Sequence, residues 1–170
     1  FGHLAGAFTG AERAREGLLV EARGGTVLLD GIDEASFDVQ AKLLRVLESG
    51  EVRPLGGGAV TRIEARYVAT SRRPLAALVR EGVFREDLLF RLNVLVLAVP
   101  PLSERREDVP DLVSTLLARH SGGRLPRVAA PALARLAAYS WPGNVRELEN
   151  ELRRLLVVGA DPIDERSLSP

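Results

Sequence analysis

The sequence contains no cysteine and no methionine among its 170 residues. Without cysteine there can be no disulfide and no cysteine–zinc site, which fits a reducing compartment such as the cytoplasm without proving it. No apolar run approaches the roughly 20 residues that a membrane-spanning helix needs, and the first residues do not resemble a signal peptide. Because residue 1 is Phe and not Met, we expect the chain to be a piece of a longer product.

The chain also lacks an excess of either charge, since 23 basic residues balance 23 acidic ones. No overall positive field would draw it to nucleic acid, so we expect no direct nucleic-acid contact. Lys42 is the only lysine, and there is no G-x-x-x-x-G-K-[ST] phosphate-binding loop. His3 and His120 have no second histidine, cysteine or paired carboxylate at ligand spacing, and we interpret neither as metal-binding.

What the sequence does contain is organised around Gly24–Asp33, which reads GGTVLLDGID. The short apolar run between glycines predicts a strand at residues 26–29 that is buried on both faces. It ends in Asp30, and ligands of open α/β sheets bind at the carboxyl ends of the strands. In the Walker B pattern such a carboxylate holds Mg²⁺ on a nucleotide. From this stretch alone, an Asp30 that merely caps the next turn is an equally good interpretation.

Hydrophobic periodicity and turn residues predict the remaining elements. Strands alternate with helices up to about residue 100, and only helices are expected after about residue 108. This order predicts an α/β unit at residues 1–107, followed by a small α-helical lid at residues 108–170. The expected elements are helices at 12–23, 36–50, 75–81 and 84–92, strands at 62–70 and 93–99, and lid helices at 108–120, 131–139 and 145–158, the last capped by Asn144 and Glu147.

The segment Gly6–Ala11 (GAFTGA) predicts a loop tip with an exposed aromatic residue, because its glycines permit turns and no apolar core face follows. Two interpretations are open for it. It is either a solvent-facing hairpin that happens to carry Phe8, or a loop that docks onto a partner, since exposed aromatics on glycine-flanked tips are typical of such loops.

Six segments together point to a family. They are GAFTGA at Gly6–Ala11, GGTVLLD at Gly24–Asp30, QAKLLRVLESGEVRPLGG at Gln40–Gly57, FREDLLFRLNV at Phe84–Val94, PPLSERREDVP at Pro100–Pro110 and WPGNVRELEN at Trp141–Asn150. In this order and spacing they resemble the central AAA+ ATPase domain of bacterial sigma-54-dependent transcriptional activators, the enhancer-binding proteins of the NtrC type. The likeness covers essentially the whole chain, and GAFTGA is nearly a signature of that family among AAA+ proteins.

The resemblance implies a P-loop-type parallel sheet flanked by helices, followed by a small helical lid. The phosphate-loop strand, which lies beside residues 93–99 in that fold, would precede Phe1. We therefore expect an incomplete sheet with exposed edges in this chain alone. The resemblance further implies a cytoplasmic bacterial regulator of a two-component system, with DNA contact made by a helix-turn-helix elsewhere.

The resemblance also implies roles for individual residues. Asp30 would hold Mg²⁺ on ATP, with Arg146 as the lid arginine at the nucleotide. Arg85 and Arg91 would act as arginine fingers on the nucleotide of the neighbouring subunit in a hexameric or heptameric ring. Residues 51–58 would form a second loop that moves with the first. The residues that would contact sigma-54 within the RNA polymerase holoenzyme are Gly6, Ala7, Phe8, Thr9, Gly10 and Ala11.

The residues themselves leave simpler interpretations open for these three arginines. Arg85 and Arg91 could be helix-surface arginines paired with Glu86 and Asp87. Arg146 could be a solvated charge in the first turn of its helix.

Departures from the family pattern bear on catalysis. Besides the missing phosphate loop, Gly31 stands where the family has the Glu that polarises the attacking water, and Arg72 aligns with the sensor Asn. Losing a positioned base costs roughly 10²–10⁴ in rate. We expect neither Asp33 nor Glu34 to substitute, because the turn would have to rearrange.

Two functions therefore stay open. One is an ATPase subunit that remodels sigma-54 polymerase. The other is a non-hydrolysing AAA+ ring member that keeps the sigma-54 loop. Whether the chain is part of an active enzyme is left open.

Overall fold

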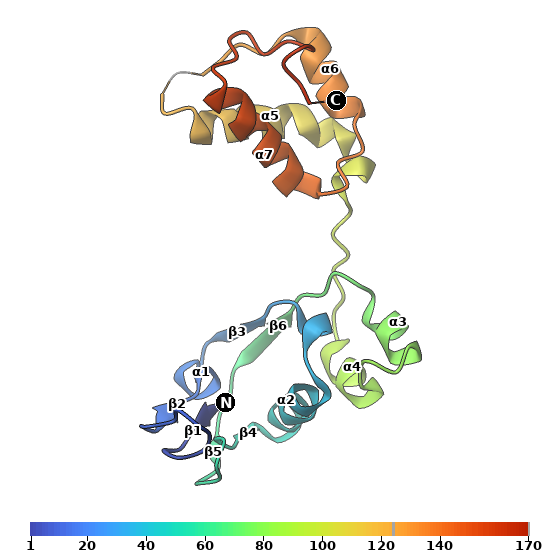
Figure 1. The fold of residues 1–170 in the computed structure, drawn as a ribbon. Coiled ribbons are helices and arrows are strands. Elements are labelled where there is room, and N and C mark those ends of the chain that lie inside the picture. The colour runs from blue at the N-terminus through green and yellow to red at the C-terminus, as the bar shows by residue number, and fades with distance from the viewer. Residues whose placement is uncertain (124, 170) are drawn as a thin grey trace. The chain divides into compact units, whose positions relative to one another are not determined.

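The computed structural model describes residues 1–123 and 125–169, which form two compact units (Figure 1). The first unit is Phe1–Val96 and the second is Leu97–Pro170. Within the described residues, the strands and helices α1 to α4 lie in the first unit, and helices α5 to α7 lie in the second.

A parallel pair of strands stands at the centre of the first unit. Strand β3 (Thr26–Leu29) runs parallel to β6 (Arg66–Ala69), which confirms the predicted strand that leads to Asp30. The prediction that this strand is buried on both faces is wrong. Leu28 is 61% exposed and Val68 is 42% exposed, because no described element covers the face of the pair that they share.

Two short antiparallel pairs complete the strands of this unit: β1 (Gly2–His3) with β2 (Arg15–Glu16), and β4 (Glu51–Val52) with β5 (Thr61–Arg62). The strand predicted at 62–70 is therefore two strands, β5 and β6, with different partners. The helix predicted at 12–23 is reduced to α1 (Leu18–Glu21). Residues 15 and 16 pair with β1 as strand β2, and the backbone of Gly17 is extended, so the helix begins only at Leu18.

The other helices of the first unit are confirmed to within two residues: α2 (Phe37–Ser49), α3 (Leu75–Arg80) and α4 (Glu86–Leu92), with a 3₁₀ turn η1 (Ile32–Glu34) before α2. Gly50 ends α2 at a φ of 72°, and a Cβ there would lie 2.6 Å from the carbonyl oxygen of Ile63. A glycine is therefore required at that position. The helices and the turn share a core made of Ile32, Leu43, Leu78, Phe84 and Leu88.

The strand predicted at Asn93–Val99 is not present. Among the described residues this segment pairs with no strand, and its side chains are exposed by 69% to 88% at the positions Val94, Leu95, Val96, Leu97 and Val99. Its apolar sequence indicates a preference for burial. A strand forms, however, only where another backbone supplies hydrogen bonds. The incomplete sheet expected for this chain is what the structure has.

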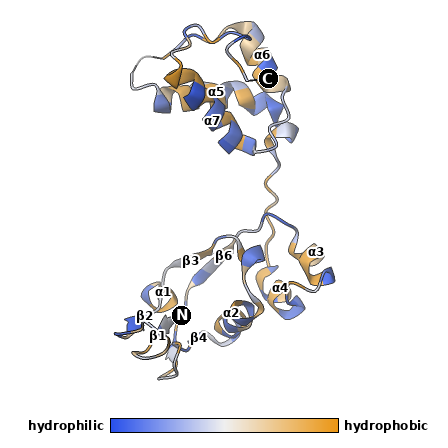
Figure 2. Ribbon diagram, in the orientation of Figure 1, coloured by the Kyte–Doolittle hydropathy of each residue, from blue (hydrophilic) through white to orange (hydrophobic). Residues whose placement is uncertain are grey.

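The second unit is a helical bundle that confirms the predicted lid helices to within two residues. It consists of 3₁₀ turns η2 (Leu102–Glu104) and η3 (Arg106–Asp108) and of helices α5 (Val109–His120), α6 (Ala130–Ala138) and α7 (Asn144–Val157). Helices α5 and α7 each carry a hydrophobic and a hydrophilic side (Figure 2). The completely buried side chains of its core come from η2, from the three helices and from the C-terminal segment: Leu102, Val109, Ala132, Leu148, Leu152, Leu155 and Ile163.

The predicted cap of the last helix is only half right. Glu147 accepts a hydrogen bond from the Gly143 N–H at 2.7 Å, as a capping carboxylate does. Asn144 does not cap, because its Oδ1 accepts the N–H of Leu102 at 3.2 Å. This side chain therefore joins the start of α7 to the 3₁₀ turn that opens the unit.

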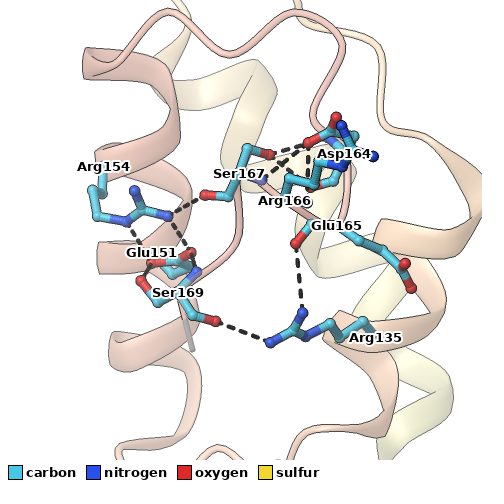
Figure 3. Close-up of polar contacts among 8 residues, drawn as sticks. All are labelled: Arg135, Glu151, Arg154, Asp164, Glu165, Arg166, Ser167 and Ser169. Atoms are coloured by element: carbon cyan, nitrogen blue, oxygen red, sulfur yellow. Dashed lines mark hydrogen bonds and ion pairs between the residues drawn. The ribbon is translucent and has the colours of Figure 1, made fainter.

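Hydrogen bonds to Glu151 hold the segment after α7 against that helix (Figure 3). The Glu151 carboxylate accepts hydrogen bonds from the N–H and the hydroxyl of Ser169, both at 2.8 Å. Arg154 donates to both oxygens of Glu151, at 2.7 and 2.9 Å, and also to the carbonyl oxygen of Ser167. These donors, with the bond from Arg154 as the largest cause, lower the pKa of Glu151 to about 2.

This lowered pKa predicts a pH-dependent contribution to stability. Since the folded-state pKa of Glu151 lies below its ordinary value of 4.5, the contribution is complete above pH 4.5 and is lost as the pH falls toward 2. We expect Glu151→Gln to lower the melting temperature at pH 7 and to have a much smaller effect near pH 2, where the carboxyl group is substantially protonated even in the folded protein. The measurement is thermal unfolding of the variant and the parent protein at both pH values. An equal loss at both would show that the charge of Glu151 is not the cause.

Candidate functional site

The carboxyl ends of β3 and β6 lie side by side, because Leu29 is opposite Ala69 in the parallel pair. The next residue along each strand is polar, and the Thr70 hydroxyl donates a hydrogen bond to Asp30 Oδ1 at 2.6 Å. The same hydroxyl oxygen accepts the Gly31 N–H at 2.9 Å. The 3₁₀ turn that follows has no side-chain cap. Asp30 is therefore held by the neighbouring strand end and does not cap the next turn.

Gly31 turns the chain out of β3 at a φ of 66°, in the left-handed region. That conformation costs a residue with a Cβ about 1–2 kcal/mol. No described atom lies within 4 Å of the place where a Cβ would sit, so the backbone is the only obstacle to a larger side chain. Glycine leaves Asp30 without a second carboxylate at the adjacent position.

Arg72 is tied to two carboxylates that follow Gly31. Its Nε lies 3.5 Å from Asp33 Oδ2, and its Nη2 donates a hydrogen bond to Glu34 Oε1. The charge of Glu34 is the main cause that raises the pKa of Arg72. We call these three residues the Arg72 clasp. The clasp holds Asp33 and one oxygen of Glu34 against Arg72.

Within the clasp, Asp33 and Arg72 differ sharply in exposure. The Asp33 side chain is 4% exposed, and its Oδ1 has no hydrogen-bond partner among the described residues. The Arg72 side chain is 71% exposed. An exposed guanidinium therefore supplies the counter-charge of a buried carboxylate.

The loop Gly6–Ala11 presents Phe8 at its tip. The loop is closed by hydrogen bonds from the Gly6 N–H to the carbonyl oxygen of Ala11 at 2.8 Å and from the Ala11 N–H to that of Phe8 at 3.0 Å. Phe8 is 51% exposed, with its ring centroid 5.0 Å from that of His3. The expected exposure is thus confirmed for Phe8, Thr9 and Gly10, whereas Ala11 is buried.

The second loop, predicted at residues 51–58, begins with strand β4 and supports the first loop through residues 54–58. The Leu4 N–H donates to the carbonyl oxygen of Leu55 at 3.0 Å, and the Leu55 N–H donates to that of Gly2 at 2.9 Å. Gly56 packs so closely that a Cβ there would lie 2.9 Å from the Cβ of Ala7. The two loops are therefore in direct contact.

The two candidate arginine fingers lie at the ends of α4. Arg85 precedes the helix and donates two hydrogen bonds to Asp87, at 2.9 and 2.6 Å. These bonds raise the pKa of Arg85 and lower that of Asp87. Arg91 donates from Nε to the carbonyl oxygen of Leu47 on α2 at 3.2 Å. The surface pairing that the sequence left open is thus found for Arg85 with Asp87, and Arg91 is held by the backbone of α2.

Arg146 lies in the second unit, in the first turn of α7, and is exposed. The contacts of the described residues give it no hydrogen bond or ion pair. Of the two histidines, His3 lies against Phe8, and His120 Nε2 lies 2.7 Å from Glu149 Oε1.

The described residues contain neither a metal-binding cluster nor a membrane-spanning helix. Within residues 1–123 and 125–169, no group of three or more His, Cys, Asp or Glu side chains could hold a metal ion. In the same part of the chain, no helix has the length and apolar character needed to cross a membrane.

Sequence reasoning did not identify Thr70 as the partner of Asp30. The available signal was its place at the end of the second strand, because parallel strands in register bring their next residues together. It also did not single out Gln40, whose side-chain oxygen accepts the backbone N–H of Arg85 at 2.9 Å. A polar residue on the apolar side of a helix was the signal in that case.

Comparison with known proteins places the chain in a family. Residues 1–98 match the sigma-54 interaction domain, and residues 103–170 match the AAA+ ATPase lid domain. The chain therefore belongs to the sigma-54 interaction family of AAA+ proteins.

Individual relatives agree with this assignment. The chain is 48% identical over 170 residues to the Nif-specific regulatory protein of Klebsiella pneumoniae, covering 99% of this chain and 32% of the relative. It is 45% identical over 166 residues to the regulatory protein AtoC of Escherichia coli, covering 96% and 36% of the two chains. It thus spans about a third of the length of these curated relatives.

Among solved structures, NtrX from Brucella abortus in complex with ATP superimposes with a TM-score of 0.86 at 35% identity. The match covers 92% of this chain and 38% of NtrX. The AAA+ fold inferred from the sequence is confirmed.

The Arg72 clasp predicts the effect of removing its guanidinium. Arg72→Met leaves the buried Asp33 carboxylate without a counter-charge, and we expect a lower free energy of unfolding than in the parent protein. Arg73→Met is the matched control, because Arg73 pairs with Glu81 at the surface, where such pairs contribute about 0–1 kcal/mol. The measurement is urea denaturation of both variants. Adding Asp33→Asn to Arg72→Met should recover part of the loss, and equal losses in the two single variants would contradict the prediction.

Proposed function

We propose that this chain is the part of a transcriptional activator that contacts sigma-54 in the RNA polymerase holoenzyme. The observation that carries the proposal is the exposed Phe8 tip of the GAFTGA loop. An exposed aromatic residue on a small-residue tip can insert into a partner without rearrangement of its own backbone. Membership of the sigma-54 interaction family supports the same conclusion.

The base of the loop suits a contact of this kind. The Gly6–Ala11 loop is closed by its own backbone hydrogen bonds and rests on residues 54–58. Interfaces gain affinity when the contact residue is held in place before binding, because less conformational entropy is lost. We infer that Ala7, Thr9 and the two glycines shape the tip, and that Phe8 makes the main contact.

The proposed contact predicts a loss of binding in Phe8→Ala. We expect the full-length protein with this change to bind sigma-54 at least about tenfold more weakly, as is usual for an aromatic hot spot. Phe37→Ala is the matched control, because Phe37 is 50% exposed on α2, away from the loop tip. The measurement is a titration of labelled sigma-54, with circular dichroism as a check of folding. Equal weakening by the two variants, or none by Phe8→Ala, would contradict the proposal.

We further propose that the edge formed by Asp30 and Thr70 faces a nucleotide, as the ATP complex of the related NtrX suggests. In nucleotide sites, Mg²⁺ is usually bound by one or two carboxylates together with phosphate oxygens and water. The Asp30 carboxylate, anchored by the Thr70 hydroxyl, fits that donor set. When bound, Mg²⁺ would neutralise phosphate charge at this edge.

The arginines would complete the nucleotide site in an assembled ring. In this proposal Arg146 approaches the nucleotide of its own subunit, and Arg85 and Arg91 approach that of a neighbour in a hexamer or heptamer. Arg85 would release Asp87 and bind phosphate oxygens instead. Guanidinium groups bind carboxylates and phosphates alike through two parallel hydrogen bonds.

A second candidate function is favoured by the surroundings of Asp30. Gly31 provides no carboxylate to orient water, and Arg72 is held by Asp33 and Glu34. We propose that the protein hydrolyses ATP weakly or not at all and acts as a non-hydrolysing ring member. The proposal of sigma-54 contact does not depend on this one.

The second candidate predicts that hydrolysis can be restored. Gly31→Glu together with Arg72→Asn should raise single-turnover hydrolysis in the full-length protein by at least about 10²-fold, the lower end for a positioned base. Open space surrounds the position of a Cβ at Gly31, so the side chain fits, although the left-handed backbone costs stability. Each single variant serves as a control. A parent rate equal to that of the double variant would rule out the non-hydrolysing proposal.

A further inference from the structure

Gln40 is the one polar residue whose surface is completely buried among residues 1–123 and 125–169. It lies in the first turn of α2, on the side that faces the core of the first unit. Burying an amide is unfavourable unless its hydrogen bonds are made inside the protein. The contacts of Gln40 therefore explain why a glutamine is found there.

The Gln40 amide uses both donors and its acceptor. Its Nε2 donates to the carbonyl oxygens of Ala35 at 2.8 Å and Val83 at 3.1 Å. Its Oε1 accepts the backbone N–H of Arg85 at 2.9 Å. One side chain thus joins the end of η1, the turn after α3 and the first residue before α4.

These three points connect the candidate site to the candidate arginine finger. Ala35 ends the turn that starts at Gly31, directly after Asp30. Arg85 is the residue from which α4 begins. The distance between the turn after Asp30 and the backbone of Arg85 is therefore set through a single rigid amide.

Arg91, the second candidate arginine finger, is also held by α2. Arg91 donates to the carbonyl oxygen of Leu47, which lies two turns after Gln40 on α2. Both ends of α4 are thus positioned against α2, the first through the backbone of Arg85 and the second through the side chain of Arg91.

We propose that Gln40 is a positioning residue that fixes the backbone of Arg85 relative to the turn after Asp30. This inference rests on the proposed function in which Arg85 reaches the nucleotide of a neighbouring subunit. The guanidinium of Arg85 must leave Asp87 to reach a nucleotide, so its present side-chain contacts are lost on assembly. The bond from its N–H to Gln40 is the anchor that remains.

The test uses two kinds of full-length subunit mixed in one assembly. The acceptor subunit carries Arg85→Ala and keeps Asp30, and the donor subunit carries Asp30→Ala and keeps Arg85. Only a donor arginine beside an acceptor site can then complete the nucleotide site. The readout is the affinity for a fluorescent, non-hydrolysable ATP analogue with Mg²⁺, measured in the mixture and in each subunit alone.

Gln40→Met is then placed in one kind of subunit at a time. In the donor we expect at least about tenfold weaker binding, because the Arg85 backbone loses its anchor and the guanidinium is no longer held where it can bind phosphate. In the acceptor, whose own position 85 is already alanine, we expect a change within about twofold. Equal weakening from both placements would show a purely structural role and overturn the inference.

Gln40→Glu separates the bond to Arg85 from the other two. In the protonated form, which burial favours, it keeps an oxygen acceptor for the Arg85 N–H and has one donor in place of two, and in the donor subunit we expect binding within about threefold of the parent. A loss as large as that of Gln40→Met would overturn the inference. If the unmodified mixture binds no more tightly than its separate subunits, the trans role of Arg85 fails and the inference fails with it.

Discussion

The parallel pairing of β3 with β6 is the interaction on which the rest of the first unit depends. Its register puts the residue after Leu29 beside the residue after Ala69, so that Asp30 and Thr70 hydrogen-bond across the strand ends. The turn that leaves Asp30 then leads into α2, and α2 supports α4. Polar groups from separate parts of the chain thereby gather at one edge of a two-stranded sheet, as is usual for ligand sites in α/β folds.

The loop tip and the strand edge are stabilised in different ways. The Gly6–Ala11 loop is held by backbone hydrogen bonds and by the close approach of Gly56 to Ala7. The strand edge is held by side chains, namely Thr70 and the Arg72 clasp. Substitutions at the tip therefore leave its base intact, whereas substitutions at the edge alter the geometry around Asp30.

Local signals were enough to predict most helices and the strand before Asp30. Helix α2 shows this best, because its apolar spacing and its terminal Gly50 both belong to the segment itself. The strand predicted at 93–99 was wrong because strand formation depends on a partner backbone that the segment's own sequence does not contain. The shortened α1 likewise reflects the pairing of Arg15 and Glu16 with β1, distant in sequence.

The candidate site shows the same difference between signals within one segment and contacts between distant segments. Asp30 and the exposed Phe8 could be read from short motifs, since each is defined by its immediate neighbours. The Arg72 clasp could not, because its bond joins residues that are 38 positions apart. Asn144 was misassigned for the same reason, since its side-chain Oδ1 accepts a hydrogen bond from the N–H of Leu102 and not from an N–H of its own helix.

The unequal exposure within the Arg72 clasp restricts the order in which its residues can be exchanged during evolution. A sequence that acquires Asp33 first buries a carboxylate with no counter-charge, which is a costly intermediate. A sequence that acquires Arg72 first only adds a charge at the surface, which proteins tolerate well. Arg72 can therefore be acquired before Asp33 at little cost, whereas the reverse order is strongly disfavoured. Once both residues are present, the buried Asp33 makes the loss of Arg72 costly, whereas the loss of Asp33 leaves only an exposed charge.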